Sequence, residues 1–545
     1  MNKTVDLKCV AYTVVLLFSP LITLAQVAPD AGRVLQEELA QPPAPPRSSP
    51  GFNIQIPTGA AVKPGGSTVT LGGLHFEGNT LFSDEELAAV AGPLTNQPYD
   101  LADISVISDR LTQHYQQVGF PFARAIVPAQ ALDNGGVLQI RVVEGRYGKV
   151  SALSDSHLAS QAQPYLSALE PGAVIESGKL ERATLLLNDL PGIEVSPVIR
   201  PGAKVGTGDL DVTLSQGKRY SARVGLDNHG NYYSGQWRAR AGLVMNSPFM
   251  LGDQISLDTL YTNEKLWLGQ AMYSVPIGSN GLRGSVSYAQ TTYSLANGFE
   301  GNEGTARIAG VGLGYPLLRS QQTNINLSAT WQYKRLRNSY FYGAASERYH
   351  STGLPVSIGF DHRDGFGGGG VTYGGLTWTY GNLHKNDPVR RGAFNKINFD
   401  LVRLQALSEN FSLFARFSGQ WANKNLDSSE SMSLGGPNSV RAYPLGESSG
   451  DEGWLTQIEL RYALGDFTPY VFYDYGRMKM NAKPNQVALL APDETRAGAG
   501  FGLRYQNASW RVDGVVAWRT QGGAPTSDTH ADPKPRLWLT ATYEF

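Results

Sequence analysis

The stretch "FSLFARFSGQW", residues 411–421, decides the fold because apolar and polar side chains alternate along most of its length. One side carries the apolar residues Phe411, Leu413, Ala415, Phe417 and Trp421. The other side carries the polar residues Ser412, Arg416, Ser418 and Gln420. A period of two residues predicts a β-strand with one apolar and one polar face.

The same alternation recurs from residue 220 to the end of the chain, for example in "WRARAGLVM" at 237–245. Apolar faces often end in Trp, Tyr or Phe, which is typical of the aromatic girdles of membrane barrels and unusual for a soluble sandwich. No stretch after residue 26 is apolar enough to span as a helix, and lipid admits only helices or closed barrels. We therefore expect an all-β transmembrane barrel over residues 219–545, with about 16 antiparallel strands at roughly 20 residues per strand and connection.

The N-terminus has the pattern of a secretory signal peptide over residues 1–25. Lys3 and Lys8 precede the apolar run "CVAYTVVLLFSPLITLA", and the chain becomes polar at Gln26. The alternative is a membrane anchor, but Pro20 interrupts a run that is already short for a span. The only cysteine, Cys9, lies in this segment. An exported mature chain is therefore expected to be stabilised by burial and backbone pairing, without disulfides.

A short helix is predicted within residues 26–41, where the sequence from residue 29 is "PDAGRVLQEELAQ". Asp30 can cap this helix, and Val34 and Leu35 give it an apolar stripe. A helix of this length is not stable alone, so it must dock on another part of the protein. Residues 42–68 are rich in Pro and then in Gly, which predicts an extended linker.

Two copies of a small α+β module are expected, at 69–147 and 148–218. Each has the order strand, helix, helix, strand, strand. The last strands, "LQIRVVEGR" at 138–146 and "LDVTLSQGK" at 210–218, match in their alternation, their glycine and their terminal base.

Composition and motifs argue against several functions. A net charge of −1 gives no basic face for nucleic acid. The string "GESSG" at 446–450 resembles a nucleophile elbow but has no following helix, and the eight histidines show no paired metal spacing. We therefore predict no catalytic residue, no metal, no cofactor and no nucleic-acid partner.

One loop carries an arginine in an apolar setting: "SLGGPNSVRAYPLGESSGDEGW", residues 433–454, with Arg441 between Val440 and Tyr443. Together with the signal peptide, helix, linker, paired modules and barrel, "VRAY" and "FYDYG" resemble the two-partner secretion transporters, the TpsB branch of the Omp85 superfamily. The modules look like POTRA domains. The C-terminal strand, with Leu537, Leu539, Tyr543 and the final Phe545 on one face, looks like the assembly signal of bacterial outer-membrane barrels.

The resemblance implies specific site residues. In that family a long loop, here about 426–453, folds into the pore and its VRG(Y/F) arginine contacts the aspartate of FxDxG on the barrel wall. The loop motif maps to Val440, Arg441, Ala442 and Tyr443, and the wall motif to Phe472, Asp474 and Gly476. Ala442 departs from the usual glycine, which makes the loop backbone less permissive. A lumenal guanidinium also needs an anionic partner on physical grounds.

The resemblance also implies a function. The chain would sit in the bacterial outer membrane, with POTRA domains in the periplasm, and would secrete a large unfolded exoprotein of haemolysin or adhesin type without nucleotide hydrolysis. Its partners would be that exoprotein, outer-membrane lipid and lipopolysaccharide, and the barrel assembly machinery. The helix would plug the pore, or else dock on a POTRA module. Alternatives for the whole chain are an Omp85 assembly factor and, less favoured, a passive porin, which leaves the repeated modules unexplained.

Overall fold

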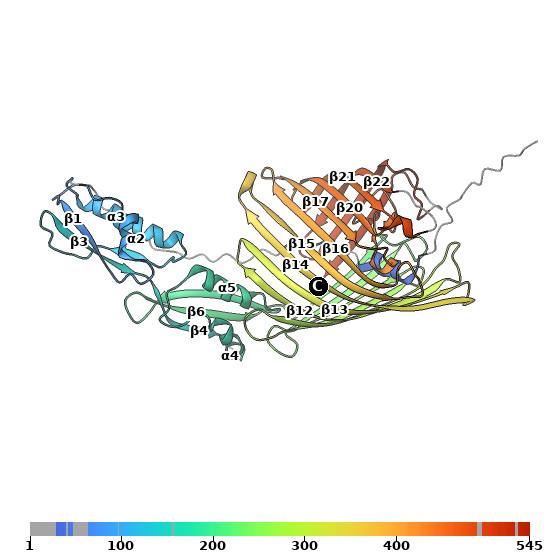
Figure 1. The fold of residues 1–545 in the computed structure, drawn as a ribbon, viewed down its shortest axis with the longest axis horizontal. Coiled ribbons are helices and arrows are strands. Elements are labelled where there is room, and N and C mark those ends of the chain that lie inside the picture. The colour runs from blue at the N-terminus through green and yellow to red at the C-terminus, as the bar shows by residue number, and fades with distance from the viewer. Residues whose placement is uncertain are drawn as a thin grey trace, which may run out of the picture.

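The computed structural model describes residues 29–39, 42–46, 64–95, 97–154, 157–487, 493–528 and 532–545. The predicted signal peptide and most of the predicted linker lie outside these residues. Figure 1 shows two small α+β modules in a row at one end of a large β-barrel.

The first module contains β1 (Leu71–Glu77), α2 (Asp84–Ala91), α3 (Leu101–Gln117), β2 (Arg124–Ile126) and β3 (Gly136–Val143). Its sheet has the order β1-β3-β2, with β1 parallel and β2 antiparallel to β3. Capping boxes begin both helices: Ser83 with Glu86 at α2, and Asp100 with Asp103 at α3. Each box supplies partners for backbone groups that a helix start leaves unpaired.

The second module repeats this topology with β4 (Arg146–Leu153), α4 (Leu158–Ala162), the 3-10 helix η1 (Gln163–Leu166), α5 (Ser177–Asn188), β5 (Ile193–Pro201) and β6 (Thr207–Gln216). Its sheet order is β4-β6-β5, again with a parallel first pair and an antiparallel second pair. Leu138 in β3 and Leu210 in β6 are both completely buried, as are Ile140 and Val212. Because β4 starts at Arg146, it begins two residues before the boundary expected at 148.

The rest of the chain forms a closed barrel of sixteen strands, each antiparallel to its neighbours. In chain order the strands are β7 (Tyr220–Asp227), β8 (Arg238–Asn246), β9 (Gln254–Thr262), β10 (Trp267–Pro276), β11 (Arg283–Ser294), β12 (Glu303–Arg319), β13 (Thr323–Tyr340), β14 (Ala345–Asp364), β15 (Gly370–His384), β16 (Gly392–Ala406), β17 (Phe411–Ala422), β20 (Glu452–Tyr462), β21 (Phe467–Lys479), β22 (Glu494–Gln506), β23 (Trp510–Gln521) and β24 (Arg536–Glu544). Pairing of β24 with β7 closes the barrel. The predicted fold class and strand number are confirmed.

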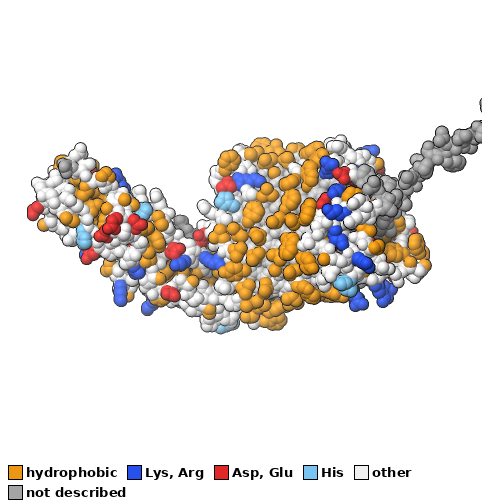
Figure 2. Space-filling model, viewed as in Figure 1, with side chains coloured by type: hydrophobic (Ala, Val, Ile, Leu, Met, Phe, Trp, Pro, Cys, Tyr) orange, Lys and Arg blue, Asp and Glu red, His pale blue; other side chains and the backbone are white. Residues whose placement is uncertain are grey.

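The barrel wall is apolar outside and polar inside. In β17, Phe411, Phe417 and Trp421 are exposed on the outer surface, whereas Ser418 and Gln420 are buried in the lumen. Figure 2 shows the resulting apolar band across the barrel. Within the described residues, every helix is too short or too polar to cross a lipid bilayer.

The two ends of the barrel differ. Short turns, such as 247–253 and 320–322, lie at the end next to the modules, and the second module docks there. Arg319 forms a bidentate pair with Asp189 at 2.7 and 2.8 Å, and Arg182 donates to the Pro316 carbonyl at 2.9 Å. The longest connection, residues 423–451 between β17 and β20, belongs to the far end. We call residues 423–451 the inward loop.

Candidate functional site

The inward loop folds into the barrel lumen, where most of its side chains are buried. It contains the 3-10 helix η3 (Ser428–Glu430) and a two-stranded ribbon of β18 (Met432–Ser433) and β19 (Ser449–Gly450). Arg441 lies near its middle, with only 3% of its side chain exposed. A guanidinium this deeply buried requires compensating negative charge.

Arg441 is held by two carboxylates. Its Nε and Nη2 atoms donate to Asp474 Oδ2 and Oδ1 at 2.8 and 2.6 Å, and its backbone N–H donates to Asp474 Oδ2 at 3.0 Å. Its Nη1 atom lies 2.5 Å from Glu459 Oε1. Burial alone lowers the pKa of Arg441, but Asp474 and Glu459 outweigh it and raise the pKa above its ordinary value. The guanidinium therefore stays charged, and its fork fixes the loop against the wall.

Phe472, Asp474 and Gly476 share the lumenal face of β21, and each meets the inward loop. The guanidinium carbon of Arg441 lies 3.6 Å from the centre of the Phe472 ring, which adds a cation–π contact. Gly476 leaves space for the side chain of Leu434, because a Cβ built there would lie 2.6 Å from a Leu434 methyl. Phe472 thus stacks on the guanidinium of Arg441, Asp474 pairs with it, and Gly476 leaves room for Leu434.

The neighbours of Arg441 in the loop are buried as well. Val440 and Tyr443 have no exposed surface. The Tyr443 hydroxyl donates to the Gln521 carbonyl at 2.7 Å. Ala442 is outside the left-handed region of backbone conformation, so glycine is not required by its φ angle. Its methyl group packs on Gly498, which has no side chain to collide with it.

Sequence reasoning missed several partners of the loop. Glu459 lies opposite Phe472 in the β20–β21 pair. Trp538, on the lumenal face of β24, donates from Nε1 to the Arg441 carbonyl at 2.7 Å. Glu459 shares the polar face of its strand with Gln457 and Arg461, which is a usable signal for a lumenal carboxylate. The identity of its partner depends on strand register.

A second anchor holds the start of the loop. Glu430 is paired with Lys334 of β13 at 2.5 Å and with Lys396 of β16 at 2.9 Å. Burial by itself raises the pKa of Glu430, but the two lysines outweigh that effect and hold the pKa at about 2. A third anchor is Glu447, whose carboxylate accepts from Arg496 at 3.0 Å and from the Thr526 backbone at 3.0 Å. The loop is therefore tied to the wall at three well-separated places.

Helix α1 (Ala31–Leu39) also lies inside the barrel, against the inward loop and the wall (Figure 1). Asp30 caps it by accepting from the Arg33 backbone N–H at 2.9 Å. Val34 and Leu35 are 1% exposed and pack among lumenal residues such as Leu336. The structure therefore places the helix in the lumen and not on a POTRA module.

Charged groups hold α1 as well. Glu38 pairs with Arg238 of β8 at 2.8 Å, and Arg238 also pairs with Asp227 at 2.6 Å. Asp30 accepts from Ser428 of the inward loop at 2.7 Å. Gly32 lies directly against Ser428 and Ser429, where a side chain would collide with η3. Helix and loop thus form one contiguous obstruction.

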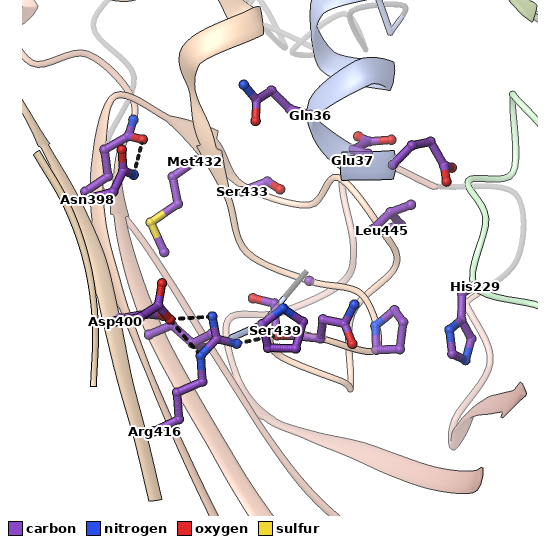
Figure 3. Close-up of a pocket in the computed structure, with 18 of the residues that line it drawn as sticks. Gln36, Glu37, His229, Asn398, Asp400, Arg416, Met432, Ser433, Ser439 and Leu445 are labelled. Carbon is purple, nitrogen blue, oxygen red and sulfur yellow. Dashed lines mark hydrogen bonds and ion pairs between the residues drawn. The ribbon is translucent and has the colours of Figure 1, made fainter. Parts of the chain in front are cut away.

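A polar cavity of about 630 Å³ remains beside this obstruction. Figure 3 shows Gln36 and Glu37 of α1, Met432, Ser433 and Ser439 of the inward loop, and the Asp400–Arg416 pair of the wall around it. Arg416 donates to Asp400 at 2.7 and 3.0 Å. Within the described part of the chain, no group of three or more His, Cys, Asp or Glu residues could hold a metal ion.

The predicted C-terminal signal residues lie on the outer surface of β24. Leu537, Leu539 and Phe545 are exposed. Tyr543 contacts Phe545 and Trp510 edge-on, with ring centres 4.8 and 5.0 Å apart. These residues do not contact the inward loop, which meets the opposite face of the same strand.

Comparison with known proteins identifies relatives of the same architecture. The chain is 27% identical over 483 residues to the heme/hemopexin transporter protein HuxB of Haemophilus influenzae (strain 86-028NP), covering 85% of this chain and 84% of that protein. It is 25% identical over 509 residues to the hemolysin transporter protein ShlB of Serratia marcescens, covering 90% and 88%. The solved structure of CdiB from Escherichia coli superposes with a TM-score of 0.73 at 21% identity, covering 92% and 94% of the two chains.

Family models agree with these relatives. Residues 69–145 match the ShlB-type POTRA domain. Residues 206–505 match the haemolysin secretion/activation protein family ShlB/FhaC/HecB. The chain therefore belongs to the haemolysin secretion/activation family ShlB/FhaC/HecB, the outer-membrane transporters of two-partner secretion.

Proposed function

We propose that this transporter secretes a large unfolded exoprotein of haemolysin or adhesin type, which the POTRA domains recognise in the periplasm and the barrel conducts to the cell surface. The observation that carries this proposal is the content of the lumen. A closed barrel is obstructed by a helix and a loop that are held by buried ion pairs in addition to apolar contacts. That arrangement suits a gated conduit better than a passive porin.

The ionic character of the contacts favours gating. When α1 leaves, water replaces the ion-pair partner of Glu38 and of Arg238. Separating this pair therefore costs less free energy than exposing an apolar surface of equal area. The apolar contacts of α1 are made by three buried side chains, Ala31, Val34 and Leu35. An arriving exoprotein segment can replace both kinds of contact.

The POTRA sheets offer a way to receive an unfolded chain. Strands β1 and β2 are the edges of the first sheet, and an extended segment can pair with such an edge through backbone hydrogen bonds. Transport by this route needs no nucleotide hydrolysis, and we propose no catalytic role for any residue.

Arg441 and Asp474 are proposed to hold the inward loop in its working position, with Val440, Ala442 and Tyr443 packing beside them. For biogenesis, we propose that Leu537, Leu539, Tyr543 and Phe545 form the strand that the barrel assembly machinery recognises.

A reversible cross-link tests the gating proposal. The only natural cysteine is Cys9, and the side chains of Asp30 and Ser428 are in contact at 2.7 Å, so an Asp30→Cys, Ser428→Cys pair probes the contact between the start of α1 and η3. We expect oxidation to stop secretion of the exoprotein and reduction to restore it in the same cells. Secretion that continues through the oxidised protein would contradict a plug that leaves.

Deletion of the whole chain distinguishes transport from barrel assembly. We expect the exoprotein to remain in the periplasm while porins assemble normally. Defective porin assembly with unchanged exoprotein secretion would favour an assembly factor instead.

A further inference from the structure

Four arginines gather on the outer surface of the barrel, near the end far from the POTRA domains: Arg307 of β12, Arg335 and Arg337 of β13, and Arg348 of β14. All four are exposed. Their sequence neighbours Ala306, Leu336 and Tyr349 are buried on the lumenal side, so the arginines point outward. We call these four residues the arginine patch.

Strand register places the arginines directly beside one another. Arg307 is opposite Arg335, and Arg337 is opposite Arg348. Neighbouring strands lie about 4.8 Å apart, and like charges in directly opposed positions destabilise a sheet. His350 and His384 continue the row of Arg307 and Arg335 across β14 and β15. Such an arrangement calls for a negatively charged partner.

The described part of the chain supplies no such partner within ion-pair distance of the arginine patch. The nearby Glu347 points into the lumen, where it lies 3.5 Å from Lys385. Arg477, an exposed arginine at the same end of the barrel, differs because it pairs with Asp493 at 2.9 Å. Among the residues that the structure describes, no carboxylate therefore neutralises the arginine patch.

The arginine patch lies at the border of the apolar band. Trp331 is on the same face of β13 as Arg335, four residues closer to the modules. Its cross-strand neighbour on β12 is Val311, and Leu354 follows Gly353, the partner of Gln332, on β14. All three are exposed apolar side chains. Four residues of strand span about 14 Å, and less along the membrane normal because barrel strands tilt. Figure 2 shows Lys and Arg side chains gathered along this border.

We propose that the arginine patch binds the phosphate groups of a phosphorylated lipid headgroup in the outer leaflet of the outer membrane. Because the arginine patch lies at the border of the apolar band, its side chains are at the depth of the lipid headgroups. The guanidinium fork matches phosphate oxygens in a bidentate manner. The two arginine pairs stand two residues apart along the strands, about 7 Å, so the best ligand carries two phosphates on one headgroup.

Lipid binding by the full-length protein tests this proposal. The protein is placed in nanodiscs of zwitterionic phosphatidylcholine, and diphosphorylated lipid A is titrated while bound lipid is counted by native mass spectrometry. The variants are Arg335→Gln with Arg337→Gln, and all four arginines changed to Gln. Arg477→Gln is the matched control, since it removes an exposed arginine that already has a carboxylate partner.

We expect affinity to fall by about fivefold for each arginine removed, and to weaken as salt is raised. Dephosphorylated lipid A should bind weakly, and millimolar inorganic phosphate should not displace the lipid. Heat-modifiable migration on gels verifies that each variant is a folded barrel. Equal binding by the fourfold variant and the wild type would overturn the proposal. So would an equal loss in Arg477→Gln, or full displacement by inorganic phosphate, which indicates a simple anion site.

Discussion

The methyl group of Ala442 occupies the space in which a side chain at Gly498 would stand. Ala442 is at the tip of the inward loop, and Gly498 is on the lumenal face of β22, so the pair joins loop and wall. The facing strand thus supplies the space for a methyl group at this position of the loop.

Moving the methyl group from residue 442 to residue 498 tests whether Ala442 and Gly498 pack directly against each other. Gly498→Ala should lower the free energy of unfolding by about 1–3 kcal/mol through overpacking. Ala442→Gly should have a small effect, and the two changes together should recover much of the loss because the methyl has only moved across the contact. The temperature of heat-modifiable migration measures this. No recovery in the double variant would contradict direct packing.

Removal of Arg441 should harm the protein more than removal of both Arg441 and Asp474. Within the described chain, Arg441 is the one ion-pair partner of Asp474, whereas Glu459 retains Arg461 at 2.6 Å and Arg504 at 3.1 Å. Arg441→Gln therefore leaves a buried, uncompensated carboxylate, at a cost of about 3–5 kcal/mol. Adding Asp474→Asn removes that carboxylate. Barrel stability should rise from the single to the double variant, while secretion stays impaired in both.

Reversing the Arg441–Asp474 pair should rescue secretion only in part. In Arg441→Asp with Asp474→Arg, the new aspartate faces Glu459, which stays in place and repels it. We expect each single reversal to abolish most secretion, and the double variant to secrete measurably more than either single variant. A further Glu459→Gln change should improve the rescue. Absence of any rescue would indicate that the two residues act separately.

Acid should loosen the inward loop through Glu430. The pKa of this carboxyl is about 2 in the folded protein and 4.5 ordinarily, so its ion pairs stabilise the fold fully above about pH 4.5. That contribution is lost as pH falls from about 4.5 to about 2, and amounts to about 3 kcal/mol. Glu430→Gln should lack this part of the pH dependence. Glu303→Gln, at an exposed carboxylate, should retain it. Stability measured across this pH range separates the two variants.

Gly32→Ala should weaken the plug although alanine favours helices. The added Cβ would collide with Ser428 and Ser429 of η3. The gain in helix propensity, about 1 kcal/mol, is smaller than a steric clash with a backbone atom. We expect higher ion conductance in planar bilayers. Gly178→Ala in α5, where a Cβ has room, should leave conductance unchanged.

The local features of the chain were predictable because their signals are local. Alternation in 411–421 predicted which side chains of β17 face lipid, and the capping residues Ser83 and Asp100 marked two helix starts. The matched strands at 138–146 and 210–218 revealed the repeated module. The pairing of Arg441 with Asp474 was predicted from the motifs of a family that the chain resembles. The need of a lumenal guanidinium for an anionic partner supported that prediction.

Contacts between distant strands were not predictable from single segments. Glu459 meets Arg441, and Glu430 meets Lys334 and Lys396, because barrel closure and register bring their strands to the same part of the lumen. The space for the Ala442 methyl group was not predictable for the same reason, since Gly498 is 56 residues away in the chain and adjacent in space.

The sequence alone determined that this protein is an exported barrel preceded by two α+β modules, with an arginine-bearing loop, because side-chain period and turn chemistry act over a few residues. The tertiary structure decided that the helix lies in the pore, that three anchors hold the loop, and that four arginines form one outward patch. Those facts depend on strand register and on closure of the barrel. Both are set by the packing of the whole barrel, so they cannot be predicted from the sequence of any one strand.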